Sequence, residues 1–191
     1  MIISHKYKII FIHIYKTAGT FIVQLLKNLD PDCEDIYGHI SAEEAKEKIN
    51  SEIWENYTTF CVVRNSWDWQ MSLYFYTKGW SGHHQHDIIK NMSVSEYLMW
   101  RKTDLHQQIK FILDNNNNCL IDKILSFENL TEDLKLFFEE TNDLDITPYL
   151  PNEKLNTSKR NSDYRKYYDN SDVELLSKLH KPDINYFNFK F

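Results

Sequence analysis

An apolar run that leads through a short polar turn into an amphipathic segment is the feature that most constrains this fold. Residues 8–14 are rich in β-branched side chains and predict a buried strand. The turn 16–20 follows, and residues 21–29 have the apolar spacing of a helix. The free N–H groups and the dipole at the start of that helix would attract an anion. The segment therefore predicts a phosphate or sulfate site between strand and helix.

A second strand–helix junction lies further along the chain. Residues 58–63 predict another buried strand, Arg64 stands at its carboxyl end, and residues 67–76 have apolar side chains at helical spacing. Arg64 and Ser72 could clamp a second phosphate with a guanidinium and a hydroxyl. The alternative is an arginine that ends a strand and a serine that faces solvent.

The remaining elements predict an α/β fold. Residues 120–126 have the composition of a third strand. The other helix candidates, four of which follow a capping residue (Ser41, Ser93, Thr131 and Ser171), cover residues 42–49, 94–101, 107–113, 132–140 and 172–180. Strands that alternate with helices indicate a parallel sheet flanked by helices on both faces, with ligands bound at the carboxyl ends of the strands. Both candidate phosphate loops leave from such ends.

Composition narrows the class of protein. The chain has 191 residues, of which 42% are hydrophobic, and this predicts one globular domain over residues 1–191. A net charge of −6 argues against nucleic-acid binding, so local cations would have to hold an anionic ligand. We expect no membrane span and no signal peptide. The three widely spaced cysteines predict free thiols in a reducing compartment, which favours a cytoplasmic protein.

The loop 16–20, together with Arg64 and Ser72, resembles the nucleotide site of sulfotransferases that use 3′-phosphoadenosine 5′-phosphosulfate (PAPS). The similarity runs nearly end to end. It is greatest to the carbohydrate-type branch, which includes the heparan sulfate 2-O-sulfotransferases and small bacterial members. In two places the chain departs from the family pattern: Tyr15 stands where proline is usual, and residues 66–67 replace a common Pro–Tyr pair.

The resemblance implies a P-loop-like three-layer fold and a specific reaction. A sulfuryl group would pass from PAPS to a hydroxyl acceptor, expected to be a carbohydrate, and adenosine 3′,5′-bisphosphate would leave. The implied nucleotide-binding residues are Lys16, Thr17, Ala18, Gly19 and Thr20 at the 5′-phosphosulfate, Arg64 and Ser72 at the 3′-phosphate, and Ser158, Lys159 and Arg160 in a late loop over the nucleotide. Lys16 would also neutralise charge on the leaving group. No metal is expected.

Transfer to a hydroxyl needs a proton acceptor, and histidine suits that role near neutral pH. His39 lies between the two phosphate motifs, and a Gly–His pair occupies this place in related small proteins, so we expect His39 to be the base. A histidine of residues 83–86 is a second candidate, and Glu43 or Glu44 is a third. The stretch 79–86 is expected to be an acceptor-binding loop. It has no carboxylate or thiol framework for a metal.

Two other functions stay open at this point. A P-loop-type nucleotide kinase fits the order of strands and helices, but the chain lacks the G-x-x-x-x-G-K-[ST] pattern and an obvious carboxylate for Mg²⁺ after a strand. A non-catalytic module would bind PAPS without transferring its sulfuryl group. A requirement for Mg²⁺ would favour the kinase, and binding without product would favour the module.

Overall fold

Two units, each with its own hydrophobic core, make up the computed structural model, which describes residues 1–151 and 160–191. Of the described residues, unit 1 comprises 1–64 and 108–151, and unit 2 comprises 65–107 and 160–191. Unit 2 is therefore assembled from two separate stretches of the chain. The expectation of a single domain over residues 1–191 stays a prediction.

Unit 1 is built on a five-stranded mixed sheet. Its strands are β1 (Ile2–Ser4), β2 (Ile9–Ile12), β3 (Glu34–Asp35), β4 (Thr58–Val63) and β5 (Lys123–Ser126), in the spatial order β3-β1-β2-β4-β5. β2, β4 and β5 are parallel, as the sequence predicted. β1 runs antiparallel to both β2 and β3, so the expectation of a wholly parallel sheet was wrong.

The antiparallel part has a simple cause. Only residues 5–8 separate β1 from β2, and Lys8 takes a left-handed backbone conformation with φ 52°. A connection this short can form a hairpin but cannot cross over to start a parallel strand. The parallel part, which carries both predicted phosphate loops, agrees with the expected α/β architecture.

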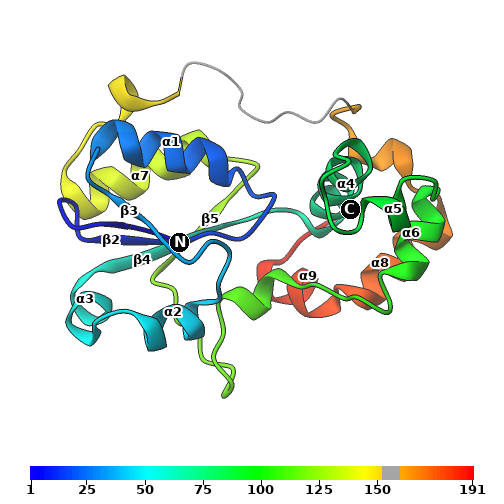
Figure 1. Cartoon of the computed structure of the whole chain (residues 1–191), viewed down its shortest axis with the longest axis horizontal. Helices are drawn as coiled ribbons and strands as arrows, with labels where there is room; N and C mark the ends of the chain where they lie inside the picture. Colours follow the sequence, from blue (N-terminus) through cyan, green and yellow to red (C-terminus); the bar gives the residue numbers. More distant parts are fainter. Residues whose placement is uncertain (152–159) are drawn as a thin grey trace. The chain divides into compact units, whose positions relative to one another are not determined.

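Helices cover both faces of this sheet (Figure 1). α1 (Gly19–Leu29) and α7 (Leu130–Asn142) lie on one face, and α2 (Ala42–Lys48) and α3 (Ser51–Asn56) lie on the other. The face under α1 and α7 holds the core, which includes Phe11, Leu25, Phe60 and Phe137. Two short 3₁₀ helices, η1 (Gln108–Phe111) and η2 (Thr147–Tyr149), complete unit 1.

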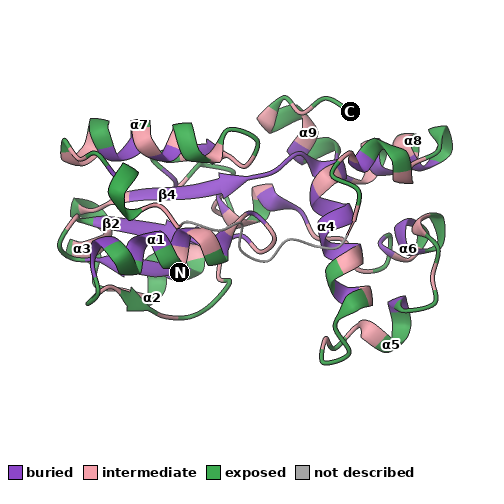
Figure 2. Ribbon diagram, turned by 90° about the horizontal axis from the view of Figure 1, so that it is seen from above, coloured by how far each residue is buried: buried purple, intermediate pink, exposed green. Residues whose placement is uncertain are grey.

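Unit 2 is helical in its described residues. It contains α4 (Ser66–Gly79), α5 (His86–Ile89), α6 (Val94–Trp100), η3 (Tyr164–Tyr167), α8 (Asn170–Leu179) and α9 (Lys181–Phe187). α4 is the most buried of these helices along its length, as Figure 2 shows. Its side chains Trp67, Met71 and Tyr74 pack with Tyr97 of α6 and Leu176 of α8 in the core of the unit.

The helix caps test the sequence reading in detail. The capping boxes predicted at Ser41 and Ser93 are present. The expected cap at Thr131 is wrong, since α7 begins at Leu130, two residues before the expected start, and Asn129 precedes it. The box predicted at Ser171 is also displaced: Asp169 caps α8 and pairs with Asp172. Residues 107–113 were expected to form a helix and instead contain η1.

Candidate anion site

The loop between β2 and α1 has an unusual backbone. Lys16 and Ala18 both adopt left-handed conformations, with φ 63° and 67°, which cost energy for residues other than glycine. Left-handed and right-handed residues in succession turn their N–H groups into one concave surface that suits an anion. The loop leads into α1 at Gly19, and the first N–H groups of any α-helix have no partner within the helix itself.

Some side chains of the loop stabilise its fold, and others are exposed and can donate hydrogen bonds to a ligand. Thr17 is fully buried, and its Oγ1 donates to the carbonyl oxygen of Ile14 at 2.7 Å. The hydroxyl proton of Thr17 is therefore already used within the loop. The carbonyl oxygen of Ala18 accepts from Ile22 N at 3.1 Å and begins the helical pattern. Thr20 lies exposed in the first turn.

Gly19 is required by close contact with a histidine. A Cβ at this position would lie 1.5 Å from Nε2 of His13, which is far inside contact distance. The imidazole of His13 thus lies directly against the start of α1, and it also stacks on the ring of Phe11 at 5.4 Å between ring centroids. Burial, and to a lesser degree the charge of His39, lowers the pKa of His13 to about 3. His13 is therefore neutral at physiological pH.

Two cations meet at this loop. Nη1 of Arg64 donates to the carbonyl oxygen of Lys16 at 3.0 Å. Burial, together with the nearby positive charge of Arg64, lowers the pKa of Lys16 to about 8. Two positive charges held close together repel each other, and a bound anion would relieve that repulsion. Loop backbone and cations therefore point to the same type of ligand.

Arg64 is held from two sides by residues that the sequence analysis did not single out. Its guanidinium stacks on the ring of Phe127, with 3.8 Å from Cζ to the ring centroid. The side-chain amide of Gln108 bonds both backbone groups of Arg64, at 2.8 Å to the N–H and 2.7 Å to the carbonyl oxygen. Phe127 directly follows the predicted third strand, which is the one signal that could have placed it beside Arg64.

His39 lies close to the same loop. Its Nδ1 is 2.9 Å from the carbonyl oxygen of His13, and its ring meets those of His13 and Tyr15 edge to face at 4.2 and 5.9 Å. Because a carbonyl oxygen only accepts, Nδ1 carries the proton, and Nε2 of the neutral ring has the lone pair. His39 is exposed, so the ring has the tautomer and the access that a proton acceptor needs.

The other predicted nucleotide residues belong to unit 2. Ser72 is buried in α4. Since Arg64 lies in unit 1 and Ser72 in unit 2, the binding of one phosphate by both residues stays a prediction. Arg160 forms a close ion pair with Asp68 of the first turn of α4, and both side chains are largely buried. Ser158 and Lys159 lie outside the described residues.

The stretch 79–86 presents aromatic rings. Trp80 is about half exposed, and its ring lies 5.5 Å from that of Tyr76 and 5.9 Å from that of His83. His84 stacks on His83 at 4.4 Å. Within residues 1–151 and 160–191, no group of three or more histidine, cysteine or acidic side chains is arranged to hold a metal ion.

Comparison of the chain with models of protein families, with curated proteins and with solved structures found no match. In the part of the chain that the structure describes, every helix is too short or too polar to cross a membrane.

Proposed function

We propose that the protein is a sulfotransferase that moves the sulfuryl group of PAPS to a hydroxyl, with a carbohydrate as the proposed acceptor. The observation that carries the proposal is the loop before α1, where a strained backbone, a helix start, Lys16 and Arg64 converge. The proposed fold is accordingly P-loop-like, since a parallel strand, an anion loop and a helix follow one another in unit 1. The three cysteines are free thiols, which agrees with the proposed cytoplasmic location.

In this proposal, Lys16 provides most of the electrostatic stabilisation of the leaving phosphate. Sulfuryl transfer breaks the bond between sulfur and the bridging oxygen, and negative charge grows on the phosphate that leaves. An ammonium beside that oxygen stabilises the charge as it develops. Because Lys16 is partly buried, its attraction for the phosphate is less weakened by water than that of a surface lysine. The N–H groups of Thr17, Gly19 and Thr20 bind the remaining phosphate oxygens.

The acceptor hydroxyl must lose its proton as it attacks sulfur. His39, the base expected from the sequence, is supported by its tautomer, since the hydrogen bond to the carbonyl of His13 leaves Nε2 as the accepting nitrogen. General base catalysis of this kind contributes about 10²- to 10⁴-fold to the rate.

Turnover of PAPS tests the proposal. We expect the protein to release adenosine 3′,5′-bisphosphate and a sulfated product from radiolabelled PAPS in the presence of a chelator, with a panel of saccharides as acceptors. Lys16→Ala should reduce the rate by about 10²-fold or more, as loss of a charge-stabilising group does elsewhere. Lys27→Ala is the matched control, because Lys27 lies in the last turn of α1 and pairs with Asp35 at 3.7 Å.

Two outcomes would overturn the proposal. Phosphoryl transfer from ATP that depends on Mg²⁺ would identify a kinase. Binding of PAPS without any sulfated product across the panel would identify a non-catalytic module.

A further inference from the structure

The proposed base lies on a stretch of unit 1 without regular structure. His39 follows β3 and precedes α2, and the two residues before it, Tyr37 and Gly38, have left-handed backbone conformations with φ 59° and 58°. His39 is exposed, so burial does not fix the orientation of its ring. A base must have a defined orientation when the substrate binds, because a loosely held group loses much of the advantage of being close. The orientation of this ring therefore has to come from specific contacts.

The hydrogen bond of His39 fixes one atom of the ring and leaves its plane undefined. Nδ1 donates to the carbonyl oxygen of His13 at 2.9 Å, and an imidazole can still rotate about such a bond. Two neighbouring rings restrain the plane. The ring of His13 lies 4.2 Å away with 64° between the planes, and the ring of Tyr15 lies 5.9 Å away with 83°. Since edge-to-face contacts have a preferred geometry, the two rings define the plane that the hydrogen bond leaves open.

Tyr15 is itself held by η1. Its ring meets the ring of Phe111 edge to face, at 5.7 Å and 75°. Phe111 is the last residue of η1, and at the start of η1 the side-chain amide of Gln108 bonds the backbone N–H and the carbonyl oxygen of Arg64. Tyr15 therefore connects the ring of His39 to the segment that supports Arg64. All of these residues belong to unit 1.

We propose that Tyr15 is a positioning residue for His39 and keeps Nε2 of its ring available to the acceptor hydroxyl. The proposal rests on the proposed sulfotransferase function. The hydroxyl proton moves to Nε2 of His39 while the hydroxyl oxygen bonds to sulfur, and the bond from sulfur to the phosphate oxygen of PAPS breaks. The bisphosphate leaves with the electron pair of that bond. Tyr15 takes no part in bond making: its ring restricts the imidazole to the orientation in which Nδ1 is bonded and Nε2 has the lone pair.

Tyr15 directly precedes Lys16 in the chain. One backbone segment thus carries both the ring next to His39 and the ammonium that is proposed to stabilise the leaving phosphate. A substitution that merely distorted this segment would weaken nucleotide binding as well. A loss confined to proton transfer, with nucleotide binding intact, therefore identifies positioning by the ring of Tyr15.

Two acceptors separate proton transfer from nucleotide binding. Glycerol must lose a proton as it reacts, whereas 4-nitrophenol is already ionised at mildly alkaline pH and needs no base. We expect Tyr15→Ala to lower kcat for sulfuryl transfer from PAPS to glycerol by about tenfold or more, because a misplaced base loses part of its contribution. Transfer to 4-nitrophenol and KM for PAPS should stay within a few-fold of the wild type. Tyr15→Phe keeps the ring and should retain the rate with glycerol.

Tyr57→Ala is the matched control. Tyr57 makes the same kind of contact with another histidine of unit 1, His5, at 5.6 Å and 78° between the rings, so its loss should leave both rates unchanged. Three results with Tyr15→Ala would overturn the proposal. Equal losses with both acceptors or a large rise in KM for PAPS would mean that the substitution damages the anion loop, and full activity with glycerol would mean that the ring is dispensable.

The tautomer of His39 tests the proposal without PAPS. A histidine side chain free in water prefers the Nε2–H form, so the Nδ1–H form of His39 depends on its hydrogen bond to His13. The ¹⁵N chemical shifts of the ring nitrogens distinguish the two forms. At mildly alkaline pH we expect the Nδ1–H form in the wild type and in Tyr15→Phe, and mainly the Nε2–H form in Tyr15→Ala. An unchanged tautomer in Tyr15→Ala would overturn the proposal.

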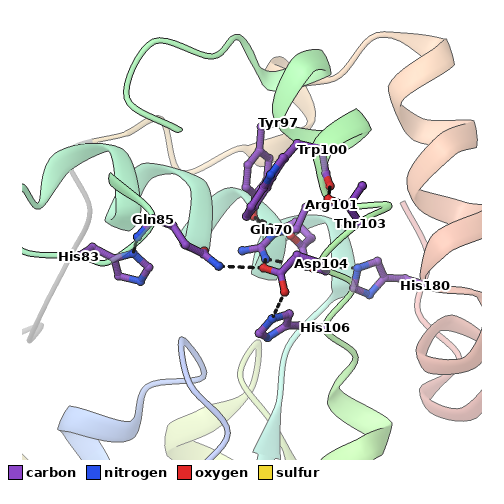
Figure 3. A network of polar contacts seen from close by, with 10 residues as sticks. All are labelled: Gln70, His83, Gln85, Tyr97, Trp100, Arg101, Thr103, Asp104, His106 and His180. Atoms are coloured by element: carbon purple, nitrogen blue, oxygen red, sulfur yellow. Dashed lines mark hydrogen bonds and ion pairs between the residues drawn. The ribbon is translucent and has the colours of Figure 1, made fainter. Parts of the chain in front are cut away.

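His106 of unit 2 is an internal reference in the same spectra. Its Nε2 is 3.0 Å from Oδ1 of Asp104, whose other oxygen accepts from Arg101 and Gln85 at 2.9 and 2.8 Å (Figure 3). Burial acts to raise the pKa of Asp104, but the hydrogen bonds and charges of these neighbours lower it overall. Because an ionised carboxylate only accepts hydrogen bonds, Nε2 of His106 carries a proton. This tautomer should be the same in the wild type and in every variant of Tyr15.

The two measurements together distinguish failure of this inference from failure of the proposed function. If Tyr15→Ala changes the tautomer of His39 but the wild type does not bind adenosine 3′,5′-bisphosphate, Tyr15 still orients the ring and the proposed function fails. If the bisphosphate binds and the tautomer does not change, the proposed function stands and the role of Tyr15 fails.

Discussion

Lys16 is the residue on which the proposed chemistry depends most, because its charge state is set by the fold. Its ammonium is partly buried beside Arg64, and both features disfavour the charged form. An anion has the opposite effect on Lys16, so binding of the nucleotide and protonation of Lys16 should support each other.

The pH dependence of nucleotide affinity tests this coupling. With a pKa of about 8, Lys16 loses its charge as the pH rises above that value. The affinity for adenosine 3′,5′-bisphosphate should therefore fall by up to about tenfold per pH unit on the alkaline side. In Lys16→Arg the charge persists, so that variant should show a flat profile over the same range. Parallel profiles for the two proteins would mean that Lys16 does not contact the ligand.

His13 should make the protein sensitive to acid. Its pKa is about 3 in the folded protein, whereas the ordinary value is 6.5. Between these two values, His13 is protonated in the unfolded chain and neutral in the folded chain. The free energy of unfolding should then fall by about 1.4 kcal/mol per pH unit from this residue as the pH drops from 6.5 toward 3. Denaturant titrations of His13→Gln should show a shallower decline, and equal slopes would contradict the assignment.

At the scale of single elements, sequence patterns predicted the helices and strands whose structure depends on neighbouring residues in the chain. β4 was predicted residue for residue, and α1 and the two capping boxes were close. The short strands β1 and β3 were not expected as members of the sheet. Their strand structure comes from pairing with neighbouring strands and not from a long run of strand-forming residues. α9 was missed because it starts directly after α8 and carries a proline in its first turn, where proline fits a helix.

The cap of α8 gives a test of one such difference. Asp169 accepts from the N–H of Asp172 at 2.8 Å, while Ser171, the expected cap, lies inside the helix. Asp169→Ala should lower the free energy of unfolding by about 1 kcal/mol, and Ser171→Ala should lower it much less. Urea titrations of both variants measure this, and the reverse order would restore the cap predicted from the sequence.

The junction of β2 and α1 gives a second test at this scale. In Gly19→Ala the new methyl group would occupy the place of the His13 ring, so the start of α1 or the ring must move. We expect a loss of about 1–3 kcal/mol in the free energy of unfolding and weaker bisphosphate binding. Adding His13→Ala should recover part of both losses. Gly79→Ala is the control, because a methyl group there meets nothing within 4 Å. Equal effects at the two glycines would contradict the contact.

At the scale of the whole molecule, the sequence predicted the α/β class and the strand–loop–helix order around residues 16–20 but not the division into two units. No Gly-, Pro- or Ser-rich linker marks the boundaries at Arg64 and Gln108. Unit 2 joins stretches that lie far apart in the chain, and such long-range assembly leaves no local periodicity. For the same reason the supports of Arg64, which come from Gln108 and Phe127, emerge only from the structure.

Calorimetric titration with adenosine 3′,5′-bisphosphate tests the central claim most directly. The account predicts tighter binding of the bisphosphate than of AMP, no requirement for Mg²⁺, and a marked loss of affinity in Arg64→Ala and Lys16→Ala. Absence of binding, or preference for ATP with Mg²⁺, would contradict it.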